Sequence, residues 1–366
     1  MGKKISETFL NQAIQNMLRN KSVFGAILRV ENGDSSFSWA GEAGNLKADD
    51  SYYIASVTKL YITAIMLMLR AEKKLTFSDK VYTFFPEGFI DGINVLGGKD
   101  YSKEITIAHL MSNTSGIPDY FYYDKQKGNS AEDLMLGNDQ AWPLERAIET
   151  AKTLKPKFKP GQKGKVHYSD TNYKLLGAII EKVTGKWVGD ALKEYIFNPL
   201  RLKDTYAYRD IDDHSPVPFY YKNQPAVHVP KYLASITAEG GIVSNALETM
   251  IFLKAFFNGF FFPKDLIEEL KENWNMIYFP GQFYFGLGLE KIWTPRIISP
   301  LKPIKEVLGF WGQTGAFAFH NPETDLYFTG TVNQVSGLGH SAAYKAMINI
   351  IKAWKTPVMP PAIDLL

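Results

Sequence analysis

The sequence predicts an α/β fold of the α+β type, in which an antiparallel sheet from both chain ends is flanked by helices and carries an inserted, mainly helical region. Three observations lead to this prediction. Strand-like segments joined by short turns lie near both termini, helical segments flank them, and the middle of the chain shows little sustained alternation of apolar and polar residues. We expect residues 1–74 and 235–366 to form the sheet region and residues 75–234 to form the insertion, together as one unit.

The first predicted element is an amphipathic helix at residues 6–19. Apolar side chains recur there at helical spacing, at positions 9, 10, 13, 14, 17 and 18. Residues 23–30 then have the composition of a strand, and Asn32-Gly33 is a strong hairpin-turn signal before a second strand at residues 36–39. The chain is therefore expected to begin with a helix and two strands.

The C-terminal part of the chain is expected to supply further strands of the same sheet. Residues 283–292, 316–320 and 326–332 are strand-like, and a turn at residues 321–324 joins the last two. A helical pattern from Ser341 to Trp354 follows, with Ser341 as its expected N-cap. Two terminal helices should thus flank the sheet.

The middle of the chain reads as a largely helical insertion. It is rich in proline and glycine and shows helical patterns at residues 105–112, 173–184 and 189–197. Its lysine-rich stretch is typical of a solvated loop, although a rim that attracts an anionic substrate is the alternative; the residues are Lys152, Lys155, Lys157, Lys159, Lys163 and Lys165.

Composition excludes several classes of function. The chain has no cysteine, which excludes a disulfide framework, a thiolate metal site and a cysteine nucleophile. Its net charge of +3 is too small to indicate a nucleic-acid partner. The histidines lack metal-ligand spacing and no Walker A sequence is present, so we expect neither a metal nor another cofactor.

Localisation and oligomeric state are not predicted. No secretory signal is visible, and the most apolar stretches are far shorter than the ~18 residues that indicate a membrane span. A signal removed beforehand would leave the same appearance, so cytoplasmic and exported origins both stay open.

A serine followed three residues later by a lysine is the first candidate for chemistry. Ser56 and Lys59 come after a strand-like run and open a helical pattern at residues 57–70, so the two side chains share one face. Helix N-termini favour developing negative charge, and burial or cationic neighbours can turn a lysine into a base. An N-cap serine with a surface lysine is the alternative. A second copy at Ser299 contains Pro300, which forbids the regular helix that the pairing needs.

Two further segments could complete such a site. Tyr168 lies in a loop that leads into the helix at residues 174–184, and could carry a proton if cationic neighbours favour its phenolate. Residues 311–316 precede a predicted strand, and Gly312 and Gly315 would let a substrate lie along this edge beside a backbone N–H. A packing tyrosine and a plain turn are the respective alternatives.

These three elements, in this order, resemble the serine β-lactamase and penicillin-binding-protein family, in particular its class C β-lactamase and esterase branch. The Ser-x-x-Lys signature is one of that family's catalytic motifs. Residues 107–118 (Ile-Ala-His-Leu-Met-Ser-Asn-Thr-Ser-Gly-Ile-Pro) look like the family's segment after the nucleophile helix. Residues 238–244 (Ala-Glu-Gly-Gly-Ile-Val-Ser) resemble its glycine-rich segment before a later helix, so the resemblance covers nearly the whole chain.

The resemblance implies a β-lactamase/transpeptidase-like fold and a role for each motif residue. Ser56 would be the acylated nucleophile, Lys59 its base partner, and Tyr168 the tyrosine of the Tyr-x-Asn motif. The sequence Gln313-Thr314-Gly315 occupies the Lys-Thr-Gly or His-Thr-Gly position. The backbone N–H groups of Ser56 and Ala316 would form the oxyanion hole, and Asp170, Gln313, Thr314 and Gly315 would contact substrate.

Two departures from the family pattern bear on the substrate. Asp170 stands where asparagine is usual, which replaces an amide donor by an acceptor. Gln313 removes the cation that commonly helps to bind a substrate carboxylate, a charge-assisted contact worth roughly 1.5–3 kcal/mol. An esterase or amidase/peptidase that accepts a small-molecule or peptide acyl substrate therefore fits better than an efficient β-lactamase.

Other functions remain as alternatives. A D-Ala-D-Ala carboxypeptidase or a weak β-lactamase stays open, as does a non-catalytic protein that binds a peptide or a cell-wall fragment. The sequence Gly339-His340-Ser341-Ala342-Ala343 looks like a degenerate nucleophile elbow, but the histidine that an α/β-hydrolase needs after its serine is missing.

Overall fold

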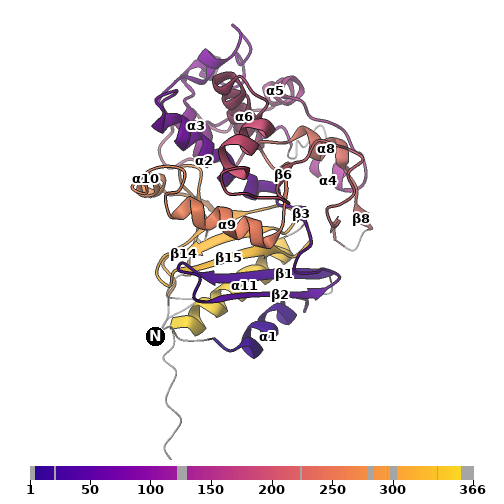
Figure 1. Cartoon of the computed structure of the whole chain (residues 1–366). Coiled ribbons are helices and arrows are strands. Elements are labelled where there is room, and N and C mark those ends of the chain that lie inside the picture. The colour runs from indigo at the N-terminus through magenta and orange to yellow at the C-terminus, as the bar shows by residue number, and fades with distance from the viewer. Residues whose placement is uncertain are drawn as a thin grey trace, which may run out of the picture.

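The computed structural model describes residues 5–19, 22–121, 130–222, 225–278, 283–294, 296, 303–335 and 337–355. Its largest feature is an eight-stranded antiparallel sheet in the order β10-β11-β12-β13-β14-β15-β1-β2 (Figure 1). The strands are β1 (Gly25–Asn32), β2 (Ser38–Gly44), β10 (Asn275–Tyr278), β11 (Phe283–Phe285), β12 (Glu290–Ile292), β13 (Val307–Trp311), β14 (Phe317–Asn321) and β15 (Leu326–Thr331). The first and last strands of the chain are neighbours, with Ile27 opposite Thr331. The predicted fold class is confirmed.

Helices cover both faces of this sheet. Helices α2 (Thr58–Ala71) and α9 (Ala246–Phe257) lie on one face, and α1 (Glu7–Met17) and α11 (Gly337–Lys355) lie on the other (Figure 1). Successive residues of β1 serve the two faces in turn: Ile27 joins the core under α2 and α9, while Ala26 and Leu28 join the core under α1 and α11. The sheet therefore separates two hydrophobic cores.

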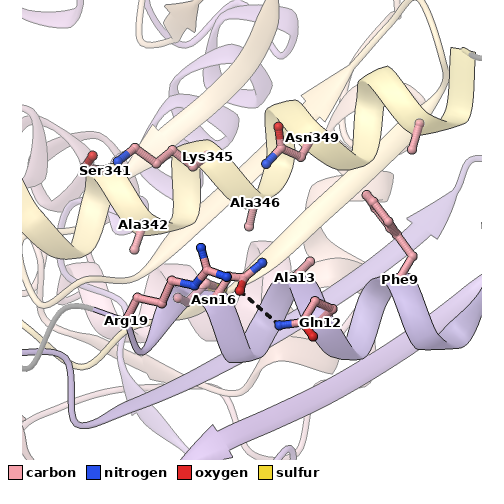
Figure 2. Close-up of a pocket in the computed structure, with 12 residues that line it drawn as sticks. Phe9, Gln12, Ala13, Asn16, Arg19, Ser341, Ala342, Lys345, Ala346 and Asn349 are labelled. Atoms are coloured by element: carbon pink, nitrogen blue, oxygen red, sulfur yellow. Dashed lines mark hydrogen bonds between the residues drawn. The ribbon is translucent and has the colours of Figure 1, made fainter.

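A groove runs between α1 and α11 on the outer face (Figure 2). Its floor contains the small side chains of Ala13 and Ala346, and polar residues such as Gln12 and Asn16 lie along it. Gln12 Nε2 donates to Asn16 Oδ1 at 3.0 Å. This groove is on the face opposite to α2, which carries Lys59.

The chain between α2 and α9 forms mainly helices and short hairpins. Its helical segments are η2 (Val81–Phe84), η3 (Ser102–Glu104), α3 (Ile107–Met111), α4 (Ser130–Met135), α5 (Leu144–Lys152), α6 (Asp170–Thr184), α7 (Val188–Leu192), the π-helical turn η4 (Lys193–Phe197) and α8 (Pro230–Ser235). Its strands are β4 (Val95–Leu96), β5 (Lys99–Asp100), β6 (Tyr206–Ala207), β7 (Phe219–Tyr220), β8 (Ala226–Val227) and β9 (Ile242–Ser244). Strand β9 pairs with both β6 and β3 (Tyr52–Tyr53), the strand before α2.

Local signals account for several helix ends. Ser6 caps α1 by accepting from Phe9 N, and Thr106 and His109 form a reciprocal capping box at α3. Helix α6 ends at Gly185, whose φ of 69° is in the left-handed region that glycine adopts without strain. Among the described residues, no helix is both long and apolar enough to cross a membrane.

The structure corrects three details of the sequence-based prediction. Residues 283–292 form two strands, because Gly286 N donates to Leu289 O and closes a turn between them. Strands β10 and β13 were not predicted. Ser341 is not an N-cap: helix α11 already begins at Gly337, so Ser341 lies inside it.

Candidate active site

Ser56 lies on the short 3-10 turn η1 (Ala55–Val57), which connects β3 to α2. The preceding residue, Ala55, has a φ of 45°, a left-handed conformation that is strained for a residue with a Cβ atom. Such strain concentrates at functional sites, where the surrounding structure holds it in place. This turn places the Ser56 side chain where the sheet region meets the helical region, in contact with Tyr168.

The three side chains predicted to be catalytic lie in mutual contact. Lys59 Nζ is 3.0 Å from Ser56 Oγ, and Ser56 Oγ is 2.7 Å from Tyr168 OH. Tyr168 is supplied by the loop just before α6, 112 residues away in the chain. The hydroxyl of Ser56 is therefore placed between two groups that can exchange protons with it.

Lys59 is fully buried and surrounded by acceptors. Its Nζ donates to Glu239 O at 2.7 Å and lies 2.7 Å from Asp170 Oδ1, in addition to its contact with Ser56. Of these contacts, those with Ser56 and Glu239 have hydrogen-bond geometry, and Asp170 Oδ1 contributes as a close opposite charge. A neutral amine would direct an N–H group to Glu239 O and its lone pair to the Ser56 hydroxyl. The geometry suits both states that a proton-transferring lysine passes through.

A second buried ion pair lies beside the first. Lys174 Nζ is 2.9 Å from Glu239 Oε1, which also accepts from Tyr120 OH at 3.0 Å. Burial raises the pKa of Glu239, while Lys174 opposes that shift.

A third buried carboxyl group, Asp119, lies near Asp170. Burial, together with the neighbouring Asp170, raises the pKa of Asp119 well above its usual range, so the neutral form of Asp119 is favoured.

The sequence interpretation assigned no role to Glu239, Lys174 or Asp119. A signal for Lys174 was available, because it follows Asp170 by four residues on α6 and such residues share a helix face. Glu239 belongs to the glycine-rich segment singled out in the sequence, yet nothing there indicates that its carbonyl contacts Lys59. Contacts of this kind depend on tertiary structure.

The Gln313-Thr314-Gly315 segment lies at the end of β13 beside Ser56. Thr314 Oγ1 donates to Tyr53 O at 2.6 Å, which ties the segment to the strand before the serine. Gly315 has a φ of 94°, and a Cβ atom there would lie 2.8 Å from Val332 Cγ2. The oxyanion-hole roles of the Ser56 and Ala316 N–H groups stay predictions.

A small cavity that opens to solvent lies next to Ser56. Its polar lining includes Asp170, Glu239, Gln313 and Thr314. The remaining walls are mostly apolar and are made by Ala55, Met135, Phe219, Tyr232, Leu233, Ile236, Gly240 and Val335. No lysine or arginine is among the described residues that line it, so the lysine-rich stretch does not contribute to these walls.

Two further points of the sequence analysis concern a metal site and the second Ser-x-x-Lys copy. Within the described ranges, no group of three or more His, Asp or Glu side chains is arranged to hold a metal ion. The Ser-x-x-Lys copy at Ser299 lies outside the described residues.

Comparison with known proteins agrees with the fold. A family model described as Beta-lactamase matches residues 10–348. A putative penicillin-binding protein, PbpX of Bacillus subtilis (strain 168), is 25% identical over 271 residues, which cover 71% of this chain and 61% of the relative. The chain thus spans less than two thirds of that relative's length.

Solved structures also share this fold. A D-stereospecific amidohydrolase from Streptomyces sp. superposes with a TM-score of 0.75 at 25% identity, covering 92% of this chain and 98% of the other. The D-amino acid amidase from Ochrobactrum anthropi SV3 gives a TM-score of 0.74 at 20% identity, with coverage of 95% and 99%. The second likeness concerns the fold alone.

Proposed function

The chain belongs to the Beta-lactamase family, and from this membership we propose that it is a serine hydrolase that forms an acyl-enzyme on Ser56. The observation that carries the proposal is the contact of Ser56 Oγ with both Lys59 Nζ and Tyr168 OH, at 3.0 and 2.7 Å. The proposed substrates are small esters or amides, including peptide-like amides.

In the proposed reaction, Ser56 Oγ attacks the carbonyl carbon while its proton passes to Lys59 Nζ. The carbonyl oxygen becomes an oxyanion, for which we propose the backbone N–H groups of Ser56 and Ala316 as donors. Tyr168 delivers a proton to the leaving group as the scissile bond breaks, and the proton held on Lys59 Nζ then passes to the Tyr168 oxygen, so that Lys59 is neutral again. Water then attacks the acyl-enzyme, giving its proton to the same base system, and the acid leaves as Ser56 Oγ regains a proton.

The cavity supports an esterase or amidase more than a hydrolase of carboxylate-bearing β-lactams. Gln313 is neutral, and no cationic side chain is among the described residues of the cavity wall. A D-Ala-D-Ala peptide or a penicillin would thus bind without the charge-assisted contact that the usual Lys-Thr-Gly segment supplies. The D-stereospecific amidohydrolase among the solved relatives is in keeping with an amide substrate.

We also propose that the sheet region (residues 1–74 and 235–366) and the inserted region (residues 75–234) act as one catalytic unit. Ser56 and Lys59 come from the first region, whereas Tyr168 and Asp170 come from the second.

Covalent trapping tests the proposal. A fluorophosphonate and a fluorescent penicillin are each incubated with the wild type, with Ser56→Ala and with Ser299→Ala, and the adduct is located by peptide mass spectrometry. We expect an adduct on Ser56 that is lost only in Ser56→Ala, since Ser299 belongs to the other copy of the motif. If neither probe labels the wild type at high concentration, the protein is a binding protein instead.

A substrate panel then separates the classes of hydrolase. Nitrophenyl esters, nitrocefin and D-amino-acid amides are compared by kcat/KM. We expect turnover of the esters or the amides to exceed that of nitrocefin, and the reverse order would support a β-lactamase.

A further inference from the structure

We propose that Asp170 makes this site selective for acyl substrates that carry an ammonium group near the scissile carbonyl. This inference rests on the proposed function and narrows its substrate class to compounds such as amino-acid amides and esters with a free amino group. Three observations on the cavity carry it.

The first observation is the position of Asp170 between Lys59 and the cavity. The Asp170 side chain is 10% exposed and lines the cavity, whereas the Lys59 side chain is 0% exposed and lies behind it. Asp170 Oδ1 lies 2.7 Å from Lys59 Nζ. Oδ1 is buried and has no hydrogen-bond partner among the described residues, so the carboxylate keeps unused acceptor capacity at the cavity wall.

The second observation is the distribution of charge around the cavity. Both Asp170 and Glu239 belong to its lining, while their partners Lys59 and Lys174 do not. Of the two acidic side chains, that of Asp170 is the more exposed, at 10% against 3% for Glu239. A substrate carboxylate would face the Asp170 carboxylate there, whereas a substrate ammonium would gain a charge-assisted hydrogen bond from it.

The third observation is that Asp170 and Ser56 lie close to each other. Asp170 and Ser56 line the same cavity, and both contact the single atom Lys59 Nζ, at 2.7 and 3.0 Å. A group bound to Asp170 therefore lies within a few bonds of a carbonyl bound at Ser56. An amino group on the carbon next to that carbonyl fits this spacing.

The apolar walls fit the remainder of such a substrate. Met135, Phe219 and Leu233 offer contact to a small aliphatic side chain and no hydrogen bond from their side chains. The site would thus recognise a small amino acid through its ammonium group and its apolar side chain.

The test compares substrates that differ at one group. Both enantiomers of alanine 4-nitroanilide are assayed with the full chain, beside N-acetylalanine 4-nitroanilide and propanoic acid 4-nitroanilide, which lack the ammonium. For the wild type we expect kcat/KM for the better alanine enantiomer to exceed that for the propanoyl compound by about tenfold or more. In Asp170→Asn this ratio should fall by at least about tenfold.

The ratio separates recognition from structural damage. Asp170 also contacts Lys59, so Asp170→Asn can lower turnover of all four compounds. A purely structural role would lower their turnover by the same factor. Asp190→Asn, an exposed position on α7, removes the same charge elsewhere and should leave the ratio unchanged. A ratio that stays within twofold of the wild type in Asp170→Asn overturns the inference.

Failure of this inference can be told apart from failure of the proposed function. A Ser56 adduct with the fluorophosphonate in the wild type and in Asp170→Asn shows an intact nucleophile, whatever the ratio is. If the wild type is labelled but hydrolyses the propanoyl compound as well as alanine nitroanilide, only the ammonium preference is wrong.

Discussion

At the scale of single residues, the site depends on how protons are shared around Ser56 Oγ. Lys59 and Tyr168 both contact this oxygen, and the tyrosine ring also lies beside the Lys59 ammonium position, with its centroid 5.1 Å from Nζ. Solvent could not take the place of Lys59, because Lys59 is fully buried.

Removal of either group should therefore slow the reaction strongly. We expect Lys59→Ala and Tyr168→Phe each to lower kcat/KM for an activated nitrophenyl ester by at least ~100-fold, the usual scale for acid–base groups. Steady-state kinetics with each variant checks this, and Tyr82→Phe, at a partly exposed tyrosine of η2, serves as the control. A near-native rate in Lys59→Ala or Tyr168→Phe would remove that residue from the mechanism.

His167, the residue before Tyr168, gives the protein a specific weakness to acid. Burial, with a smaller effect of Lys157, lowers the pKa of His167 from 6.5 to about 4, and its buried Nε2 has no hydrogen-bond partner among the described residues. The unfolded chain binds this proton near pH 6.5 and the folded chain only near pH 4. Stability from this group is therefore complete above pH 6.5 and is lost as the pH falls from 6.5 to 4.

Replacing His167 by glutamine should weaken the dependence of the free energy of unfolding on pH. Between pH 7 and pH 4.5 the wild type should lose about 2 kcal/mol more of its free energy of unfolding than His167→Gln does. Urea titrations at both pH values measure the difference, with His214→Gln, at an exposed histidine, as the control. An equal loss in wild type and His167→Gln would contradict the assignment.

The sequence predicts residue types better than it predicts their partners. Ser56, Lys59 and Tyr168 could be proposed because local spacing pairs the serine with the lysine and because the resemblance to the serine β-lactamase family implies a role for each of the three. The acceptor role expected for Asp170 could be read in the same way. The Lys174–Glu239 pair and the Glu239 carbonyl on Lys59 could not, because they join segments 65 and 180 residues apart (239 − 174 and 239 − 59).

At the scale of elements, β13 leads into the segment that we propose contacts substrate. It contacts η1, and Gly312 at its end leaves no room for a larger residue, since a Cβ atom there would lie 2.3 Å from Ile54 O. This strand escaped the sequence prediction because Gly309 interrupts its short apolar run. Strands β14 and β15 were predictable because a clear turn separates two longer runs.

A methyl group at Gly312 should therefore disturb catalysis more than stability. We expect Gly312→Ala to push β13 away from the Ile54–Ser56 segment and to lower kcat/KM for a nitrophenyl ester about 10- to 100-fold. Ester kinetics and a thermal melt are measured together. Gly164→Ala is the control: its new Cβ meets open space, although its φ of 70° is strained, so it should cost stability and spare turnover. Equal turnover in the two variants would argue against a positioning role for β13.

At the scale of the whole molecule, one sheet joins two cores. The core under α1 and α11 contains none of the residues proposed for catalysis, and the core under α2 and α9 packs against Tyr168. Both use strands β1, β14 and β15, so loss of either core removes support from the sheet that carries the site.

Damage to the core under α1 and α11 should therefore lower the free energy of unfolding without changing the turnover of the folded enzyme. Ile14 on α1 is 2% exposed, and Ile14→Ala should cost about 3 kcal/mol of unfolding free energy. Circular dichroism and ester hydrolysis, both followed through a urea titration, should show coincident midpoints that shift together. Gln12→Ala, on the exposed side of the same helix, should leave both midpoints in place. Two separate transitions for Ile14→Ala would mean that the cores unfold independently.

The pairing of β1 with β15 also has a consequence during synthesis on the ribosome. Residues 25–32 acquire their neighbour on that side only after residues 326–331 have been translated. Until then β1 and β2 expose an unpaired edge with apolar side chains, a template for association with other nascent chains. We expect the newly made chain to depend on holding chaperones until its last strand emerges, and to fold slowly afterwards because this closure spans almost the entire polypeptide.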